Sequence, residues 1–218
     1  MLFRSGQATL ADAQSLEREL GTQLAMIVDA GPSPLAEGSA VLRLGRGSFE
    51  LLRPGLMDLE RLREVAGLRL GFVCTGNTCR SPMAEGLARH ALEERLGTRN
   101  LTDFGFEVSS MGVYAGPGAP PSEHGVRVLS QRGIDIAQHR SQGVPFDRLG
   151  GFDALYCLTQ SHRQALLSAL PPGQGPAVEL LDPEGRDVSD PIGGSLADYE
   201  SCASMIARAI KTRLDHWA

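Results

Sequence analysis

Apolar residues along this chain follow two patterns, which are short continuous runs and longer stretches with an apolar residue every three or four positions. The runs at 70–73 and 152–158 predict a buried and a mostly buried strand, and two further strands are predicted at 106–109 and 178–181. Helical spacing predicts helices at 82–96, 122–132, 160–170 and 196–217. Because strands alternate with helices, the pattern predicts an α/β domain with a parallel sheet, whose ligands bind beyond the carboxyl ends of the strands.

The first 66 residues carry a shorter set of predicted elements. These are a helix at 9–20, a buried strand at 24–28, a loop at 29–34, a hairpin formed by 40–44 and 49–52 around the turn 45–48, and a helix at 57–66. The pattern therefore predicts two domains, a small α/β extension over residues 1–66 and a larger α/β domain over 67–218.

Composition and charge narrow the class of protein. The 218 residues are 42% hydrophobic with a formal net charge of -5, and no long basic run predicts a nucleic-acid partner. No apolar stretch approaches the roughly 20 residues of a membrane span, and the N-terminus lacks the apolar core of a signal peptide. Four cysteines indicate thiols kept reduced in the cytoplasm. Cys74 and Cys79 have no second pair at zinc spacing, so we expect neither metal nor another cofactor.

One local motif carries candidate chemistry. Cys74 ends the apolar run 70–73, Arg80 follows after five intervening residues, and Ser81-Pro82 begins a predicted helix. A short polar loop of this kind points its N–H groups inward at an anion, and the helix N-terminus adds its dipole. Arg80 is able to hold two phosphate oxygens in a fork, and this positive field stabilises a Cys74 thiolate. The motif predicts Cys74 as a nucleophile toward phosphorus, while the alternative is a buried cysteine beside an unrelated arginine.

The stretch 72–85, Phe-Val-Cys-Thr-Gly-Asn-Thr-Cys-Arg-Ser-Pro-Met-Ala-Glu, resembles the signature of the low-molecular-weight protein tyrosine phosphatase family. Within that family it most resembles the bacterial protein-arginine-phosphatase branch. The resemblance continues at 108–112, at 153–159 and at 190–195, and it covers about residues 68–216. It implies a flavodoxin-like, four-stranded parallel sheet with helices on both faces. It also implies a phosphatase that acts on phosphorylated proteins through a cysteinyl-phosphate intermediate.

The resemblance also implies roles within the loop. Ser81 donates a hydrogen bond to the Cys74 thiolate, and Asn77 holds the loop through its side chain. Cys79 either traps an oxidised Cys74 as a disulfide or is simply a small residue that fits the loop. The predicted phosphate-binding residues are Thr75, Gly76, Asn77, Thr78, Cys79 and Ser81.

The second half of the reaction needs an acid for the leaving group and a base for water. Two Asp-Pro pairs compete for this role, Asp182-Pro183 and Asp190-Pro191. Only the second runs into an apolar residue, Gly-Gly-Ser and a helix, as in the arginine-phosphatase branch, so we assign Asp190. Asp187 is predicted to be a loop residue.

Separate predictions apply to three histidines and to the two remaining cysteines. His162 is predicted to be structural, and His139 to position a loop. His124 either lines the pocket or faces solvent, and Cys157 and Cys202 are predicted core residues.

Substrate choice depends on family-level comparisons at two positions. Tyrosine-directed members usually carry a bulky aliphatic residue where Thr78 stands, and aromatic residues just after the catalytic Asp-Pro, where this chain has Ile192. We therefore favour phosphoarginine, with phosphotyrosine as the alternative and Tyr114 or Tyr199 as possible ring donors. Two further alternatives are an arsenate reductase, which needs more cysteines as a relay, and a phosphate-binding module without activity. The sequence predicts neither the target protein nor the oligomeric state.

Residues 1–66 resemble the tail of a threonylcarbamoyl-AMP synthase domain, through 27–34 (Ile-Val-Asp-Ala-Gly-Pro-Ser-Pro) and 52–55 (Leu-Arg-Pro-Gly). That family builds much of its nucleotide site upstream of this piece, so no activity is carried over. The segment is predicted to be an accessory fragment, with a regulatory or partner-binding role as the alternative.

Overall fold

The computed structural model describes residues 10–32, 37–45, 48–171 and 175–217 of the chain. The chain divides into two compact units, Met1–Val65 and Ala66–Ala218. Within the described residues, no helix combines the length and the apolar character needed to cross a bilayer.

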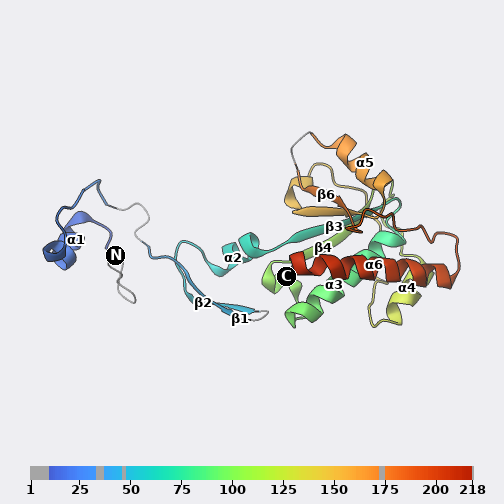
Figure 1. Ribbon diagram of the computed structural model, residues 1–218, viewed down its shortest axis with the longest axis horizontal. Coiled ribbons are helices and arrows are strands. Elements are labelled where there is room, and N and C mark those ends of the chain that lie inside the picture. The colour runs from blue at the N-terminus through green and yellow to red at the C-terminus, as the bar shows by residue number, and fades with distance from the viewer. Residues whose placement is uncertain (1–9, 33–36, 46–47, 172–174, 218) are drawn as a thin grey trace. The chain divides into compact units, whose positions relative to one another are not determined.

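A four-stranded parallel sheet forms the centre of the second unit (Figure 1). Its strands lie in the order β4-β3-β5-β6. Their bounds are Arg69–Cys74 for β3, Glu107–Gly112 for β4, Ala154–Cys157 for β5 and Ala177–Leu180 for β6. The predicted α/β fold with a parallel sheet is confirmed, and the inner position of β3 places its last residue, Cys74, beside Gly112 of β4.

Helices cover both faces of this sheet (Figure 1). One face carries α3 (Arg80–Leu96), α4 (Glu123–Ser130) and α6 (Leu196–Trp217), and the other carries α5 (Gln160–Ala169). Short 3-10 turns lie at Leu101–Phe104 and Leu149–Gly151. Strands β3 and β5 are buried along almost their whole length, which explains why they appear in the sequence as apolar runs.

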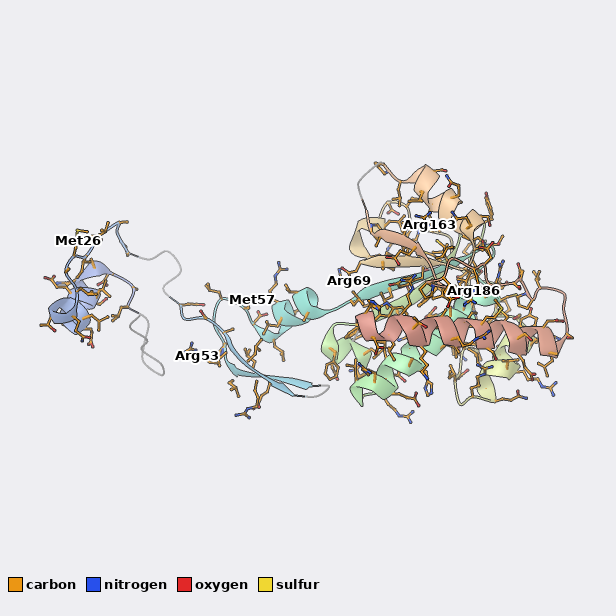
Figure 2. The ribbon with its side chains drawn as sticks, in the orientation of Figure 1. Met26, Arg53, Met57, Arg69, Arg163 and Arg186 are labelled. Atoms are coloured by element: carbon orange, nitrogen blue, oxygen red, sulfur yellow. The ribbon has the colours of Figure 1, made fainter. Side chains whose placement is uncertain are left out.

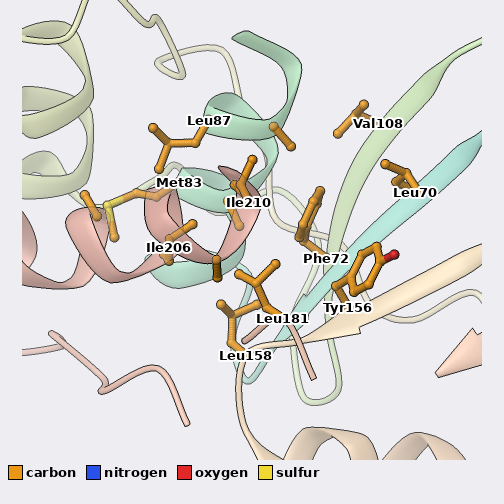
Figure 3. Packing of buried hydrophobic residues seen from close by; sticks show 14 of the residues in the cluster. Leu70, Phe72, Met83, Leu87, Val108, Tyr156, Leu158, Leu181, Ile206 and Ile210 are labelled. Atoms are coloured by element: carbon orange, nitrogen blue, oxygen red, sulfur yellow. The ribbon is translucent and has the colours of Figure 1, made fainter. Parts of the chain in front are cut away.

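Side chains of β3 belong to two clusters of the hydrophobic core, one on each face of the sheet. Leu70 and Phe72 of β3 are fully buried with α3 and α6, whereas Val73 packs in a second cluster with Leu166 of α5. Figure 3 shows the first cluster, in which Phe72 lies between the sheet and α6. Its ring centroid lies 6.2 Å from that of Trp217, near the end of α6. Each large apolar side chain buried in this way contributes about 1.5–3 kcal/mol.

Helix α3 begins two residues earlier than the sequence predicted. The prediction placed Pro82 at the first helical position, but the helix starts at Arg80, with Cys79 as its N-cap. Proline fits here because the first turn of a helix needs no N–H donor from it. Arg80 and Ser81 therefore belong to the first helical turn, next to the loop that follows β3.

The first unit contains helix α1 (Ala13–Leu20), a 3-10 turn at Gly21–Gln23 and a hairpin of β1 (Val41–Gly45) and β2 (Ser48–Arg53). Helix α2 (Leu59–Ala66) ends at the start of the second unit. The side chain of Asp12 caps α1 by accepting from the Ser15 N–H at 2.6 Å. The hairpin is confirmed. Residues 9, 33–34 and 46–47 of the predicted elements lie outside the described residues.

The strand predicted at 24–28 is wrong. The segment is irregular, and Met26 and Val28 are 77% and 80% exposed. Figure 2 labels Met26 on this segment. An apolar run becomes a strand only when a neighbouring strand satisfies its N–H and C=O groups. Among the described residues this run pairs with no strand, and so its apolar character did not produce one.

Candidate active site

The candidate site lies at the carboxyl end of β3. The loop 75–79 leaves the strand after Cys74 and enters α3 at Arg80. The chain following β4 closes over this loop, with Val113 N donating to Cys74 O at 2.9 Å and Tyr114 N to Thr75 O at 3.0 Å. Gly112 makes the approach possible, because a Cβ there would lie 2.5 Å from Thr75 O. The sheet and its glycine thus set the shape of the loop.

Cys74 is 3% exposed, and its sulfur lies 2.9 Å from Ser81 Oγ and 3.3 Å from the backbone N of Asn77. Ser81 Oγ accepts from Asn77 Nδ2 at 2.9 Å, which directs the single hydroxyl hydrogen of Ser81 away from Asn77. That hydrogen is available to Cys74, with Met111 O more distant at 3.3 Å. A thiolate at Cys74 thus has two donors, as predicted for Ser81.

Asn77 gives the loop its tight curl. It is fully buried and has a φ of +54°, a left-handed conformation that asparagine tolerates better than most residues. Its Nδ2 also donates to Ser110 Oγ at 2.9 Å, while Oδ1 accepts from Gln142 N at 2.8 Å. His139 Nε2 donates to its carbonyl oxygen at 2.9 Å. The side chain of Asn77 thus holds the loop by bonds to side chains as well as to backbone.

Several residues that support the loop received no role in the sequence analysis. Ser110 Oγ donates to Glu85 Oε2 at 2.7 Å, and His139 Nδ1 lies 3.8 Å from the same oxygen. Glu85 and Ser110 lie inside the stretches 72–85 and 108–112 that resemble the family, but this position does not reveal their hydrogen-bond partners. Gln142 had no signal of its own in the sequence. His139 was expected to position a loop, and the loop it contacts is that of Asn77.

Arg80 lies at the centre of the polar contacts, with only 5% of its surface exposed. Its Nη1 donates to Val188 O at 3.3 Å, and Nη2 donates to Thr75 Oγ1 at 3.3 Å. The same Nη2 forms an ion pair with Asp190, whose side chain is 39% exposed. The fold therefore brings the Cys74 loop, Arg80 and Asp190 to one place, although Asp190 lies far along the chain.

Asp182 and Asp187, the other aspartates considered in the sequence analysis, accept hydrogen bonds from other residues. Asp182 Oδ2 accepts from Arg186 Nε at 2.8 Å, and although burial opposes the change, this bond lowers the pKa of Asp182. Asp187 Oδ1 accepts from the backbone N of Gln160 at 2.7 Å, at the start of α5. Among the contacts of the described residues, only Asp190 of the three bonds to Arg80.

The wall around Cys79 is less polar. Its sulfur lies 3.3 Å from the hydroxyl of Tyr199, which is itself buried and packs edge-on against His124. Burial raises the pKa of Tyr199, so its hydroxyl stays protonated. Thr78 is half-buried, and its hydroxyl has one long contact of 3.7 Å to the Cys79 sulfur.

The four cysteines are free and buried. For Cys157 and Cys202, burial raises the pKa of the thiol to about 12, so both are neutral core residues. A disulfide-trapping role for Cys79 stays a prediction. In the described part of the chain, no group of three or more His, Cys, Asp or Glu side chains is arranged to hold a metal ion.

Comparison with known proteins identifies the class. The profile of the low molecular weight phosphotyrosine protein phosphatase family matches residues 69–216. A protein-arginine-phosphatase of Geobacillus stearothermophilus is 33% identical over 136 residues, which cover 61% of this chain and 84% of the relative. A low molecular weight protein-tyrosine-phosphatase of Streptomyces coelicolor is 35% identical over 149 residues, covering 65% of this chain and 88% of the relative.

Solved structures agree with the sequence relatives. The low molecular weight protein tyrosine phosphatase from T. tengcongensis superposes with a TM-score of 0.60 at 35% identity, over 68% of this chain and 99% of that one. The YwlE arginine phosphatase from Geobacillus stearothermophilus gives 0.57 at 29% identity, over 68% and 97% of the two chains. The chain belongs to the low molecular weight phosphotyrosine protein phosphatase family and is a cysteine-dependent protein phosphatase.

The match begins at residue 69, so it leaves the N-terminal segment aside. The resemblance of residues 1–66 to the tail of a threonylcarbamoyl-AMP synthase stays a prediction.

Proposed function

We propose that this phosphatase removes the phosphoryl group from phosphoarginine side chains of proteins. The observation that carries the proposal is the hydroxyl of the half-buried Thr78, whose one side-chain hydrogen bond among the described residues is the long one to the Cys79 sulfur. Such a hydroxyl is able to accept from a guanidinium N–H of the substrate. Ile192, which follows the Asp-Pro pair, is 69% exposed and offers no aromatic ring for a phenyl group.

In the proposed first step, the Cys74 thiolate attacks phosphorus and the P–N bond to the guanidine breaks. A guanidine is a much stronger base than a phenol, so its departure requires a proton. Asp190, in its protonated form, donates that proton to the leaving nitrogen. The loop N–H groups and Arg80 stabilise the charge on the phosphoryl oxygens. The products of this step are an unmodified arginine side chain in the substrate protein and a cysteinyl phosphate at Cys74.

In the second step, water attacks the cysteinyl phosphate while the Asp190 carboxylate takes a proton from that water. The S–P bond breaks, inorganic phosphate leaves and the Cys74 thiolate is restored. Ser81 and the backbone N–H of Asn77 support the sulfur as a leaving group through their contacts of 2.9 Å and 3.3 Å. One carboxyl group thus serves as acid and then as base.

Phosphotyrosine is the second candidate, and one observation favours it. Tyr114 is 80% exposed, and its backbone N bonds to Thr75 O, so an accessible aromatic residue lies beside the phosphate loop. Tyr199 is less suitable, because its ring is buried against His124 and its hydroxyl faces Cys79. An arsenate reductase is disfavoured because Cys157 and Cys202 are buried and neutral. The expected cytoplasmic location belongs to this proposal and is supported by the four free thiols. The phosphoprotein partner is supported by the family to which the chain belongs.

The test compares one peptide sequence carrying either phosphoarginine or phosphotyrosine, with para-nitrophenyl phosphate as a generic aryl ester. We expect the higher kcat/KM on phosphoarginine. Cys74→Ser should abolish turnover of all three while phosphate or vanadate still binds, because the loop and Arg80 remain. A wild-type preference for phosphotyrosine overturns the arginine assignment. Turnover by Cys74→Ser within tenfold of wild type overturns the mechanism, and a wild type inactive on all three substrates would support a binding-only module.

A further inference from the structure

The side chain of His162 contacts the phosphate loop. It belongs to the first turn of α5, where its backbone N donates to the side chain of the N-cap residue Thr159 at 3.4 Å. The residue is 3% exposed, and its Nε2 reaches the hydroxyl of Thr75 at 2.8 Å. Thr75 is the first residue of the phosphate loop, so α5 contacts that loop directly through His162.

The direction of the hydrogen bonds follows from Arg80, which has no acceptor atom. Because Arg80 Nη2 donates to Thr75 Oγ1, the hydroxyl hydrogen of Thr75 is left for His162 Nε2. Nε2 is then the acceptor nitrogen and Nδ1 carries the hydrogen, which it donates to Thr159 Oγ1 at 2.9 Å. The Thr159 hydroxyl in turn bonds to Ser161 Oγ at 2.8 Å. Every member of this chain is satisfied with a neutral imidazole.

Charge and burial keep the ring neutral. Burial, and then the positive charge of Arg80, lower the pKa of His162 to about 4, while Asp190 and Asp187 oppose the change. A protonated Nε2 would lose its acceptor role toward Thr75 and place a second cation beside Arg80. Neutrality is therefore required for the chain of bonds that ends on Arg80.

We propose that His162 is a positioning residue for phosphoryl transfer, which acts through the Thr75 hydroxyl to hold the Arg80 guanidinium at the phosphate site. Arg80 contacts Val188, Thr75 and Asp190, and the ion pair with Asp190 is weakened when that carboxylate is protonated to serve as acid. Val188 O and Thr75 Oγ1, each 3.3 Å from the guanidinium, are then the remaining anchors. His162 fixes the second anchor, and this role rests on the proposed catalytic use of Arg80 and Asp190.

The test is a double-mutant cycle on para-nitrophenyl phosphate, a substrate that does not depend on the arginine assignment. His162→Leu and Thr75→Val each remove the bond between the two side chains. Each should lower kcat about tenfold, because the charged Arg80 guanidinium loses a fixed hydrogen-bond anchor. The double variant should be no slower than the slower single variant, because both changes break one chain.

Two further variants separate positioning from folding. His162→Gln keeps an acceptor for Thr75 and a donor for Thr159, and it should recover kcat to within about threefold of wild type. His90→Leu is the matched control, because His90 lies half-exposed on α3 beside Glu94, and it should leave kcat unchanged. The urea midpoint of each variant reports its stability separately.

The opposing outcomes are distinct from those that test the substrate. A wild-type kcat in Thr75→Val, an additive loss of about a hundredfold in the double variant, or equal activity of His162→Gln and His162→Leu overturns the positioning role. If His162→Leu does not fold, the kcat of Thr75→Val still tests the positioning role. A wild-type preference for phosphotyrosine overturns the arginine assignment alone and leaves these expectations in place.

Discussion

Asp190 and Asp182 both precede proline, yet their side chains pair with different arginines. Asp190 pairs with the buried Arg80, whereas Asp182 pairs with Arg186, whose side chain is 65% exposed. Only an aspartate beside Arg80 is placed to exchange protons with a group bound in the phosphate loop. The two residues therefore form a matched pair for testing the acid.

Asp190→Asn should lower kcat on phosphoarginine by about 10²–10⁴, the usual range for loss of a general acid. Asp182→Asn should change kcat less than about threefold, because it removes one ion pair to an exposed arginine. Steady-state kinetics on both variants check this. The assignment of Asp190 is wrong if Asp182→Asn is the variant with the large loss.

Thr78 is the residue at which the two candidate substrates should separate. Thr78→Ile adds bulk and removes the hydroxyl where a guanidinium is expected to lie, which leaves an N–H donor unpaired. Such a donor costs about 1–3 kcal/mol, or roughly tenfold to a hundredfold in kcat/KM on phosphoarginine. A phosphotyrosine peptide presents no donor there, so its kcat/KM should rise or stay unchanged.

Thr78→Ser, which keeps the hydroxyl, is the control and should keep the wild-type preference. General damage to the loop would lower both substrates together in Thr78→Ile. An equal loss on the two peptides therefore counts against Thr78 as the specificity residue.

At the scale of elements, the site depends on the contact between the end of β4 and the phosphate loop. A Cβ at Gly112 would lie 2.5 Å from Thr75 O and 2.9 Å from Asn77 N, and both are backbone atoms that cannot move aside without distorting the loop. The strand pairing of Cys74 with Gly112 fixes this approach. The loop is therefore shaped by a neighbouring strand as well as by its own residues.

Gly112→Ala should weaken phosphate binding and lower kcat by at least about tenfold, since it displaces the N–H groups that face the anion. Gly116→Ala is the control in the loop after β4, because a Cβ there meets nothing within 4 Å. Calorimetric titration with phosphate and kinetics on para-nitrophenyl phosphate measure both effects. Wild-type phosphate affinity in Gly112→Ala would show that the close approach does not shape the site.

At the scale of the whole molecule, the family match and the described site residues lie in the second unit. We expect a truncated chain that begins at Gly67 to retain the catalytic constants of the full chain, because residues 1–66 are predicted to be accessory. Circular dichroism establishes that the truncated chain is folded before its kinetics are compared. A folded chain with lost activity would assign the first unit a catalytic or regulatory role.

The buried imidazole of His162 also links the stability of the fold to pH. Its pKa is about 4 in the folded protein, against an ordinary value of 6.5. Between these values the unfolded chain binds a proton that the folded chain does not, so the free energy of unfolding falls as pH is lowered from about 6.5 to about 4. The loss attributable to this one group is at most about 3 kcal/mol.

Urea unfolding at a series of pH values, compared with His162→Gln, isolates this contribution. The wild type should lose stability more steeply than His162→Gln between pH 6.5 and 4. Parallel curves for the two proteins would mean that folding does not lower the pKa of His162.

The amino-acid sequence by itself determined the elements of the second unit and the composition of the phosphate loop. All four strands were predicted, and the apolar runs of β3 and β5 match strands that are buried along almost their whole length. Helix α6 was predicted with the bounds Leu196–Trp217 that it has. The strand, loop and helix around Cys74 are adjacent in sequence, and the family resemblance of this one stretch implied the contact of Ser81 with Cys74 and the role of Asn77 in the loop.

The tertiary structure decided whatever depends on a partner distant in the chain. The run at 24–28 is apolar but pairs with no strand among the described residues, so it is not a strand. Ser110 and His139 support Asn77, and His162 reaches Thr75, across many tens of residues. Spacing along the chain encodes the local backbone, whereas these contacts depend on how the sheet brings separate loops to one edge.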